Sequence, residues 1–225
     1  MSMPPFTPTR RRLLGWLAAT LALPPVLAPA AAFDDFFKAV KFDDVDRVQS
    51  LLRRGMDPNT VEEERGESAA MVALREESMK VFRLLIDAPG FDPEVQARNG
   101  DTALMLAAYK GNMEAAAALL ARGAQVNRPG WTALHYAAAS GKNDMVHLLL
   151  ERSAYIDAES PNRTTPIMMA ARGGHIMTVK LLLDEGADAA LRNEAGMDAI
   201  DFARAGDFRD IVEGLTYRLR KAGKR

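Results

Sequence analysis

A motif that returns at a fixed interval constrains this chain of 225 residues more than any other feature. Two copies begin at Thr132 and Thr165, 33 residues apart, and a fainter copy begins the same distance further on, at Asp198. The copies read Thr-Ala-Leu-Met-Leu-Ala-Ala from Thr102, Thr-Ala-Leu-His-Tyr-Ala-Ala from Thr132, Thr-Pro-Ile-Met-Met-Ala-Ala from Thr165 and Asp-Ala-Ile-Asp-Phe-Ala from Asp198. Such a period predicts stacked units, each of which buries its apolar face only against its neighbours.

Each copy predicts the same two short helices. A glycine follows nine residues after each threonine, where a first helix must stop, because glycine adopts a left-handed conformation without steric cost. A leucine pair then indicates the buried ridge of a second helix, and Ala-Ala pairs in the first helix permit close helix–helix approach. These residues are Gly111, Gly141 and Gly174; Leu119-Leu120, Leu149-Leu150 and Leu182-Leu183; and the closing pairs Gly123-Ala124, Ser153-Ala154 and Gly186-Ala187.

This pattern closely resembles the ankyrin repeat, whose signature runs Gly-x-Thr-Pro-Leu-His-x-Ala-Ala, then Gly-His, Leu-Leu and Gly-Ala. The stretch Gly130–Ala138 and the stretch Gly173-Gly174-His175 match it nearly residue for residue. The resemblance covers the chain from about Phe33 to the last residue. It implies an all-α solenoid of about six stacked helix-turn-helix units joined by hairpin loops, over residues 33–65, 66–99, 100–129, 130–162, 163–195 and 196–225.

The outer units depart from the pattern, as terminal repeats with a polar outer face do. The first keeps its second helix, Val45–Leu52, and lacks the threonine turn. The second has Glu77 where glycine is expected. The last replaces the leucine pair with Gly214-Leu215 and ends in a basic helix, Tyr217–Lys221.

Residues 1–32 form a segment of a different kind. They contain no acid, and the arginines Arg10–Arg12 precede an apolar stretch, Leu13–Val26, and a run of small residues. This organisation predicts a secretory signal peptide with small residues at Ala30 and Ala32 and cleavage after Ala32. Pro24-Pro25 interrupts the apolar stretch, so we expect no stable membrane span after cleavage.

The arginines Arg10 and Arg11 refine this prediction. The stretch Thr9–Leu14 resembles the bacterial twin-arginine export motif, a route that delivers folded proteins, although Gly15 stands where that motif commonly has lysine. An ordinary Sec signal is the alternative. Either route predicts a periplasmic protein of a Gram-negative bacterium.

The residue inventory contains no recognisable catalytic motif. The absence of cysteine excludes disulfides, thiol nucleophiles and Cys-ligated metal sites. The ankyrin resemblance implies that His135 hydrogen-bonds within the turn to the neighbouring unit and that His175 starts a second helix, while His147 falls on an outer helix face. Since His-Glu-x-x-His, Gly-x-Ser-x-Gly and phosphate-loop motifs are all absent, we expect no enzyme, no cofactor and no metal site.

Twelve methionines raise a second hypothesis. Thioethers favour Cu(I), and three methionines flank His175, so the chain is alternatively a small-ligand or copper-binding stress-protection protein. The three are Met168, Met169 and Met177. However, Met105, Met168 and Met169 fall on apolar first-helix positions, where methionine commonly fills gaps in a core. The pattern therefore favours packing over metal binding.

Binding of a protein partner is the leading hypothesis. The resemblance implies that the loop tips and the exposed ends of the first helices line a concave binding face. Reading across the units gives a partly basic series with aromatic residues near its middle, and Trp, Tyr and Arg dominate binding hot spots. The predicted partner-binding residues are Arg75, Asp101, Tyr109, Lys110, Trp131, Arg172, Met197 and Arg204. Trp131 has an alternative, structural role, which is to pack over the shortened loop Asn127–Gly130.

Charge limits the class of partner. The net charge is −1 at pH 7 and no broad polybasic tract is present, which argues against nucleic acid. The basic tail Arg218–Arg225 is more typical of a solvated face than of a binding site. We therefore expect a monomeric module that binds a protein with a moderately acidic surface. A host-directed effector is a third hypothesis, against which the export leader argues.

Overall fold

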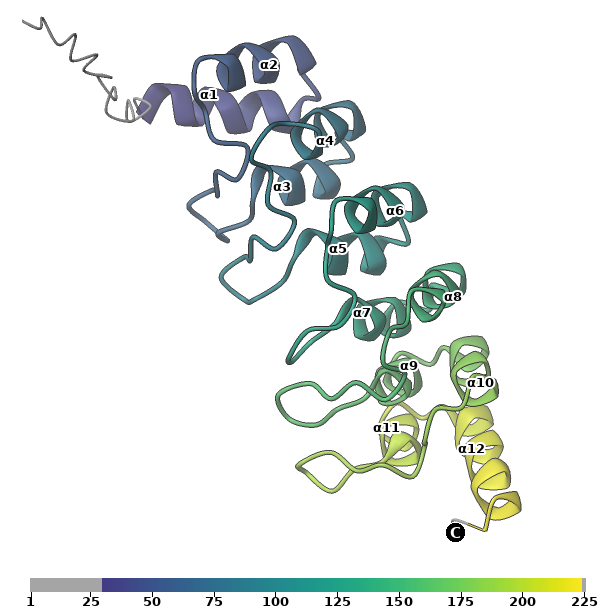
Figure 1. Cartoon of the computed structure of the whole chain (residues 1–225). Helices are drawn as coiled ribbons and strands as arrows, with labels where there is room; N and C mark the ends of the chain where they lie inside the picture. Colours follow the sequence, from purple (N-terminus) through teal and green to yellow (C-terminus); the bar gives the residue numbers. More distant parts are fainter. Residues whose placement is uncertain (1–29, 224–225) are drawn as a thin grey trace, which may run out of the picture.

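The structure is a computed structural model that describes residues 30–223, and it is an array of paired α-helices (Figure 1). The first helices of the six pairs are α1 (Ala30–Lys41), α3 (Ala69–Arg75), α5 (Ala103–Lys110), α7 (Ala133–Ala139), α9 (Pro166–Arg172) and α11 (Ala199–Ala205). The second helices are α2 (Val45–Arg53), α4 (Met79–Ile86), α6 (Met113–Ala121), α8 (Asn143–Glu151), α10 (Ile176–Asp184) and α12 (Arg209–Lys221). Within the described residues, strand pairing is limited to one isolated bridge between Val61 and Ser68. The predicted all-α solenoid is confirmed.

A capping residue at the same position of successive units explains where their first helices begin. Thr102, Thr132 and Thr165 stand directly before α5, α7 and α9 in extended backbone. Ser68 and Asp198 take this place in the outer units, and their side chains accept hydrogen bonds from backbone N–H groups of the first turn. Such bonds satisfy donors that a helix start leaves without partners. The degenerate units thus keep the cap although they lose the threonine.

The left-handed residue after each first helix is also retained where glycine is not. Gly111, Gly141 and Gly174 have φ values of 73°, 69° and 72°. Glu77 and Asp207 fill the equivalent positions with φ values of 62° and 57°. A side chain in this conformation costs about 1–2 kcal/mol relative to glycine. The outer units therefore make the same turn at a conformational cost.

The second helices correct one detail of the sequence prediction. Only one leucine of each pair is fully buried, as Leu149 and Leu182 are 0% exposed. Leu215 follows 33 residues after Leu182 and is 1% exposed, so the last unit keeps this buried leucine. Gly214 stands in the place of Leu181, and the basic segment predicted as a separate helix is the last part of α12.

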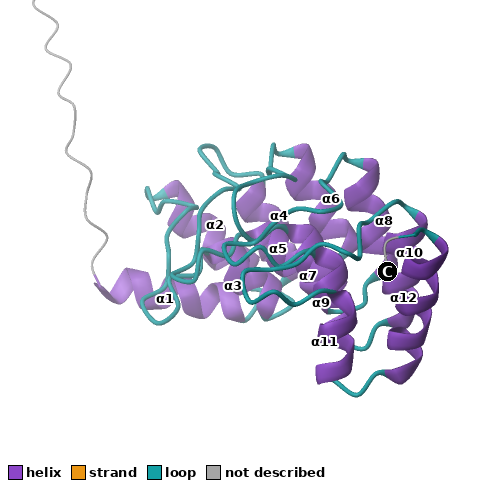
Figure 2. Ribbon diagram, turned by 90° about the horizontal axis from the view of Figure 1, so that it is seen from below, coloured by secondary structure: helices purple, strands orange, loops and turns teal. Residues whose placement is uncertain are grey.

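The arrangement of the pairs defines two faces. The row of helices bends, with the first helices on the inner side and the second helices on the outer side (Figure 2). The first helices α5, α7, α9 and α11 contact one another more extensively than any other helices do, because alanine pairs such as Ala137-Ala138 are buried and let the backbones approach. The hairpin loops all project on one side of the array (Figure 1).

The structure describes only the last residues of the predicted signal peptide. The predicted export arginines Arg10 and Arg11 lie outside the described residues. Helix α1 begins at Ala30, so the predicted cleavage after Ala32 would fall in its first turn. In the part of the chain that the structure describes, every helix is too short or too polar to cross a membrane.

Candidate functional site

A hollow of about 270 Å³ opens on the row of first helices and is centred on α7. Tyr109 of α5 and Arg172 of α9 stand at its edges, and Trp131 precedes α7. The structure thus brings three of the predicted partner-binding residues to one place. The complete lining is Tyr109, Trp131, His135, Tyr136, Ala139, Met169 and Arg172.

A difference in side-chain size creates this hollow. Tyr109, Ala139 and Arg172 are each the seventh residue after the threonine of their unit, so they are equivalent positions on adjacent helices. The methyl group of Ala139 leaves space between the two large neighbours. Tyr136 and Met169 lie three residues before Ala139 and Arg172, on the same helix faces, because residues i and i+3 are neighbours on a helix. Neither residue is among the predicted partner-binding residues, although the i, i+3 spacing could have identified both.

The floor contains a histidine whose nitrogen atoms both have hydrogen-bond partners. His135 is 0% exposed, and its Nδ1 lies 3.2 Å from the Thr132 backbone nitrogen and 2.9 Å from the Thr132 hydroxyl. Its Nε2 lies 2.9 Å from the Thr164 carbonyl oxygen in the next unit. The backbone N–H must donate to Nδ1, so Nε2 carries the proton of the neutral ring. The contact to the neighbouring unit that the resemblance implied for His135 is confirmed.

Burial keeps this imidazole neutral. Desolvation lowers the pKa of His135 from 6.5 to about 4, because the buried charged form loses its hydration, and hydrogen bonds to backbone carbonyls oppose the shift only in part. At neutral pH the floor of the hollow therefore carries no positive charge from His135.

The second polar residue of the floor is tied to a hairpin loop. The hydroxyl of Tyr136 donates to Oδ1 of Asp101, and Asn99 Nδ2 donates to Oδ2 at 2.7 Å. Burial first and the Asp101 carboxylate second raise the pKa of the Tyr136 phenol, so it stays protonated. Asp101, a predicted partner-binding residue, lies where it fixes the orientation of Tyr136.

Trp131 packs against the floor of the hollow and also lines it. Its ring meets the His135 ring edge to face, with centroids 5.2 Å apart and an interplanar angle of 77°. This geometry is favoured for aromatic pairs. Trp131 is nevertheless only half-buried and lines the hollow. It therefore packs on His135 and keeps part of its surface open to the hollow.

The basic series that the sequence predicted is largely neutralised within the chain. The Arg75 guanidinium lies 2.7 Å from Glu67, Lys110 Nζ lies 3.4 Å from Glu77, and Arg204 lies 3.3 Å from Asp201. Arg172 is exposed and takes part in none of the ion pairs between described residues. Its positive charge is the member of the series that remains available at the hollow.

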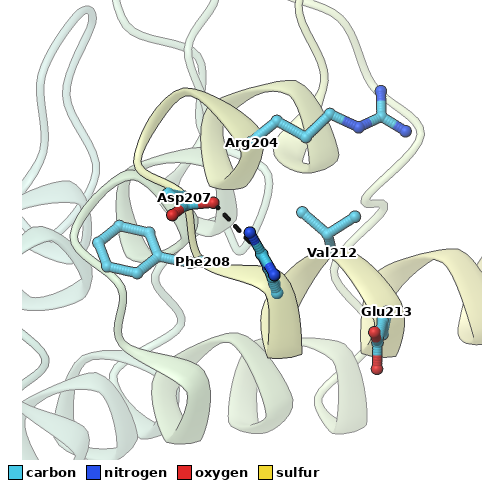
Figure 3. Close-up of a pocket in the computed structure, with 6 residues that line it drawn as sticks. Arg204, Asp207, Phe208, Val212 and Glu213 are labelled. Atoms are coloured by element: carbon cyan, nitrogen blue, oxygen red, sulfur yellow. Dashed lines mark ion pairs between the residues drawn. The ribbon is translucent and has the colours of Figure 1, made fainter.

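Two predicted residues lie away from this hollow. Arg204 lines a separate depression of about 190 Å³ between α11 and α12, at the carboxyl-terminal end of the array (Figure 3). There Phe208 and Val212 supply apolar surface, and Asp207 pairs with Arg209 at 3.5 Å. Met197 is half-buried and donates its backbone N–H to Asn193 Oδ1 at 3.0 Å within the last hairpin.

The burial of the methionines and the placement of the possible metal ligands relate to the copper-binding hypothesis. Met105 and Met168 are 2% and 1% exposed and belong to the core, as their helical spacing predicted. Met169 is half-buried and lines the hollow. No group of three His, Cys, Asp or Glu residues suited to a metal ion occurs among residues 30–223. Met177, the third methionine beside His175 in the sequence, is 61% exposed, so it does not belong to the core.

Stacked pairs of short helices define a repeat protein of the solenoid class. Family profiles agree: ankyrin repeats in three copies match residues 36–129 and 80–160, and a single ankyrin repeat matches residues 162–194. The chain belongs to the ankyrin repeat family. Ankyrin repeats generally mediate protein–protein interactions and typically lack enzymatic activity.

Similar stretches occur in proteins of very different size. The chain is 32% identical over 181 residues to protein glp-1 of Caenorhabditis elegans, a match that covers 73% of this chain and 14% of that protein. It is 28% identical over 160 residues to the human transient receptor potential cation channel subfamily A member 1, covering 66% of this chain and 14% of the channel. A putative ankyrin repeat-containing protein of Treponema pallidum is 29% identical over 181 residues, covering 76% of this chain and 58% of that protein. The chain thus spans only a small part of the first two relatives.

Proposed function

We propose that this chain is a non-catalytic protein-interaction module of the bacterial periplasm that binds a protein partner through its concave face. The hollow formed by Tyr109, Trp131 and Arg172 carries this proposal. Aromatic and arginine side chains are enriched at the centres of interfaces because they bury large areas while offering polar tips. A half-open hollow on a rigid row of helices provides such a centre.

The proposed location is supported by sequence alone. The arginines Arg10 and Arg11, the apolar stretch after them and the small residues at Ala30 and Ala32 have the organisation of a twin-arginine-like leader. A chain without cysteine is compatible with an oxidising compartment. Export of the folded array would then deliver the preformed hollow to the periplasm.

Expression of the full chain with a carboxyl-terminal tag in a Gram-negative host tests both parts of the proposal. Fractionation followed by amino-terminal sequencing should place a protein that starts at Phe33 in the periplasm. Full-length protein in the cytoplasm or the membrane would contradict the location while leaving the interaction surface to be tested in that compartment.

The interaction surface is tested with paired variants in the same capture experiment. Tyr109→Ala with Arg172→Ala should abolish capture of a stoichiometric companion while leaving thermal unfolding nearly unchanged, because both side chains are exposed. Tyr155→Ala with Arg152→Ala removes the same residue types after α8, away from the hollow, and should leave capture intact. Equal loss in both double variants, or unfolding of the first, would contradict the surface assignment.

A further inference from the structure

The polar groups of the hollow divide into two sets. In the floor, both His135 nitrogens and the Tyr136 hydroxyl are already hydrogen-bonded within the chain. At the rim stand the Tyr109 hydroxyl, the Trp131 indole N–H and the Arg172 guanidinium, and none of these has a hydrogen-bond or ion-pair partner among residues 30–223. The floor therefore behaves as an apolar surface, and the rim offers hydrogen-bond donors.

The charges around the hollow select the sign of an occupant. The nearby Asp101 carboxylate already accepts hydrogen bonds from Tyr136 and Asn99. Lys110, which follows Tyr109, pairs with Glu77 at 3.4 Å. Arg172 is the charged residue of the lining. A guanidinium binds a carboxylate well, because two parallel N–H groups can donate to its two oxygens. The same positive charge disfavours a cationic occupant, although three aromatic rings are present.

From this arrangement we propose that the hollow binds a partner segment in which one apolar side chain stands next to a carboxylate. The apolar side chain fills the space over Ala139, against Tyr136 and Met169, and the carboxylate meets Arg172 at the rim. This inference rests on the proposed function, because it specifies the partner chemistry of the same surface. It also narrows the partner from a generally acidic surface to one acid beside one apolar group.

Three small probes of matched shape separate these features. They are 3-phenylpropionate, 3-phenylpropanamide and 3-phenylpropylammonium, which share the ring and differ in the charge of the end group. Binding to the full chain is followed by NMR through the Trp131 indole N–H, with Trp16→Phe used to assign that signal. We expect the carboxylate probe to bind at least about threefold more tightly than the amide probe, because an exposed ion pair contributes an affinity gain of this size. The ammonium probe should bind most weakly.

Two variants assign the preference to named residues. Arg172→Gln should remove the preference for carboxylate over amide while both probes still bind. Ala139→Leu should abolish binding of all three probes, because the larger side chain fills the space over α7. Arg152→Gln, an exposed arginine at the end of α8, is the matched charge control and should leave all affinities unchanged. Circular dichroism of each variant verifies that the array is folded.

Several outcomes would overturn the inference. They are equal binding of the carboxylate and the amide to the unaltered chain, tighter binding of the ammonium probe, unchanged binding in Ala139→Leu, and no binding of any probe. Any of these results leaves the capture experiment with Tyr109→Ala and Arg172→Ala intact, so a failure of the inferred chemistry is distinguishable from a failure of the proposed interaction module.

Discussion

His135 shows how one side chain can join two units of the array. It caps its own helix through Thr132 and reaches Thr164 of the next unit, and the bond that Nδ1 accepts from the Thr132 N–H requires the neutral ring. Protonation of Nδ1 would place a second donor against the Thr132 N–H. The stability of the junction between these units is therefore linked to pH.

We expect the free energy of unfolding to fall as the pH decreases from 6.5 toward 4. The folded pKa of His135 is about 4 and its ordinary value is 6.5, so within this window the unfolded chain binds more protons. The loss should approach about 3 kcal/mol at pH 4 and should be absent above pH 7. Urea unfolding at several pH values measures it. His135→Gln is the control, because glutamine also completes a capping box but does not titrate. A variant with the same pH dependence as the unaltered chain would exclude this role of His135.

Glu77 provides the second prediction at the residue scale. It holds a left-handed conformation that glycine adopts without steric cost, and its side chain is 82% exposed in the ion pair with Lys110. Glu77→Gly should therefore raise the free energy of unfolding by about 1 kcal/mol, since the exposed pair contributes little. Glu77→Ala removes the same pair and keeps the unfavourable φ, so it should give no gain. Thermal unfolding of both variants shows whether a gain in stability comes from relief of backbone strain or from loss of the Glu77 charge.

At the scale of elements, a side chain of one unit packs over a glycine of the preceding unit. A Cβ atom at Gly141 would lie 2.6 Å from the His175 ring, and one at Gly111 would lie 2.9 Å from the Lys142 side chain. Phe208 covers Gly174 in the same way. These glycines therefore serve two purposes, because they permit the left-handed turn and leave room for the next unit.

Two glycines with nearly the same φ separate these purposes. Gly174 and Gly196 have φ values of 72° and 73°, but no atom lies within 4 Å of a Cβ at Gly196. Gly196→Ala should cost about 1 kcal/mol, from the left-handed conformation alone. Gly174→Ala should cost about 2–4 kcal/mol, because the methyl group also meets Phe208. Equal losses in chemical denaturation would show that Phe208 moves aside freely.

The elements also show what the sequence could and could not predict. The helix starts at Thr132 and Thr165 and the stops at Gly141 and Gly174 are local features, so the repeated motif located them. The neutralisation of Lys110 by Glu77 depends on how adjacent units are placed, and a motif does not contain that information. The hollow likewise arises from the contrast of Ala139 with its neighbours on other helices.

At the scale of the whole molecule, stability should vary along the array. Each interior unit is packed on both sides, whereas α1–α2 and α11–α12 have a neighbouring unit on one side only within the described residues. Stability in such arrays is approximately a sum over units and nearest-neighbour interfaces. We expect amide hydrogens of α5, α7 and α9 to exchange most slowly, and those of α2 and α12 at least about tenfold faster. Hydrogen exchange followed by mass spectrometry tests this order, and uniform protection would indicate a single cooperative unit.

The size contrast at the seventh residue of each unit has a consequence for how this protein can evolve. Tyr109, Ala139 and Arg172 contribute to the shape of the hollow, while helix caps, glycine turns and buried alanines determine the stacking. Under the proposed function, mutations at those three positions change what the surface recognises with little penalty to folding. A lineage of such proteins can acquire new partners by drift at a few outward positions while selection preserves the scaffold beneath them.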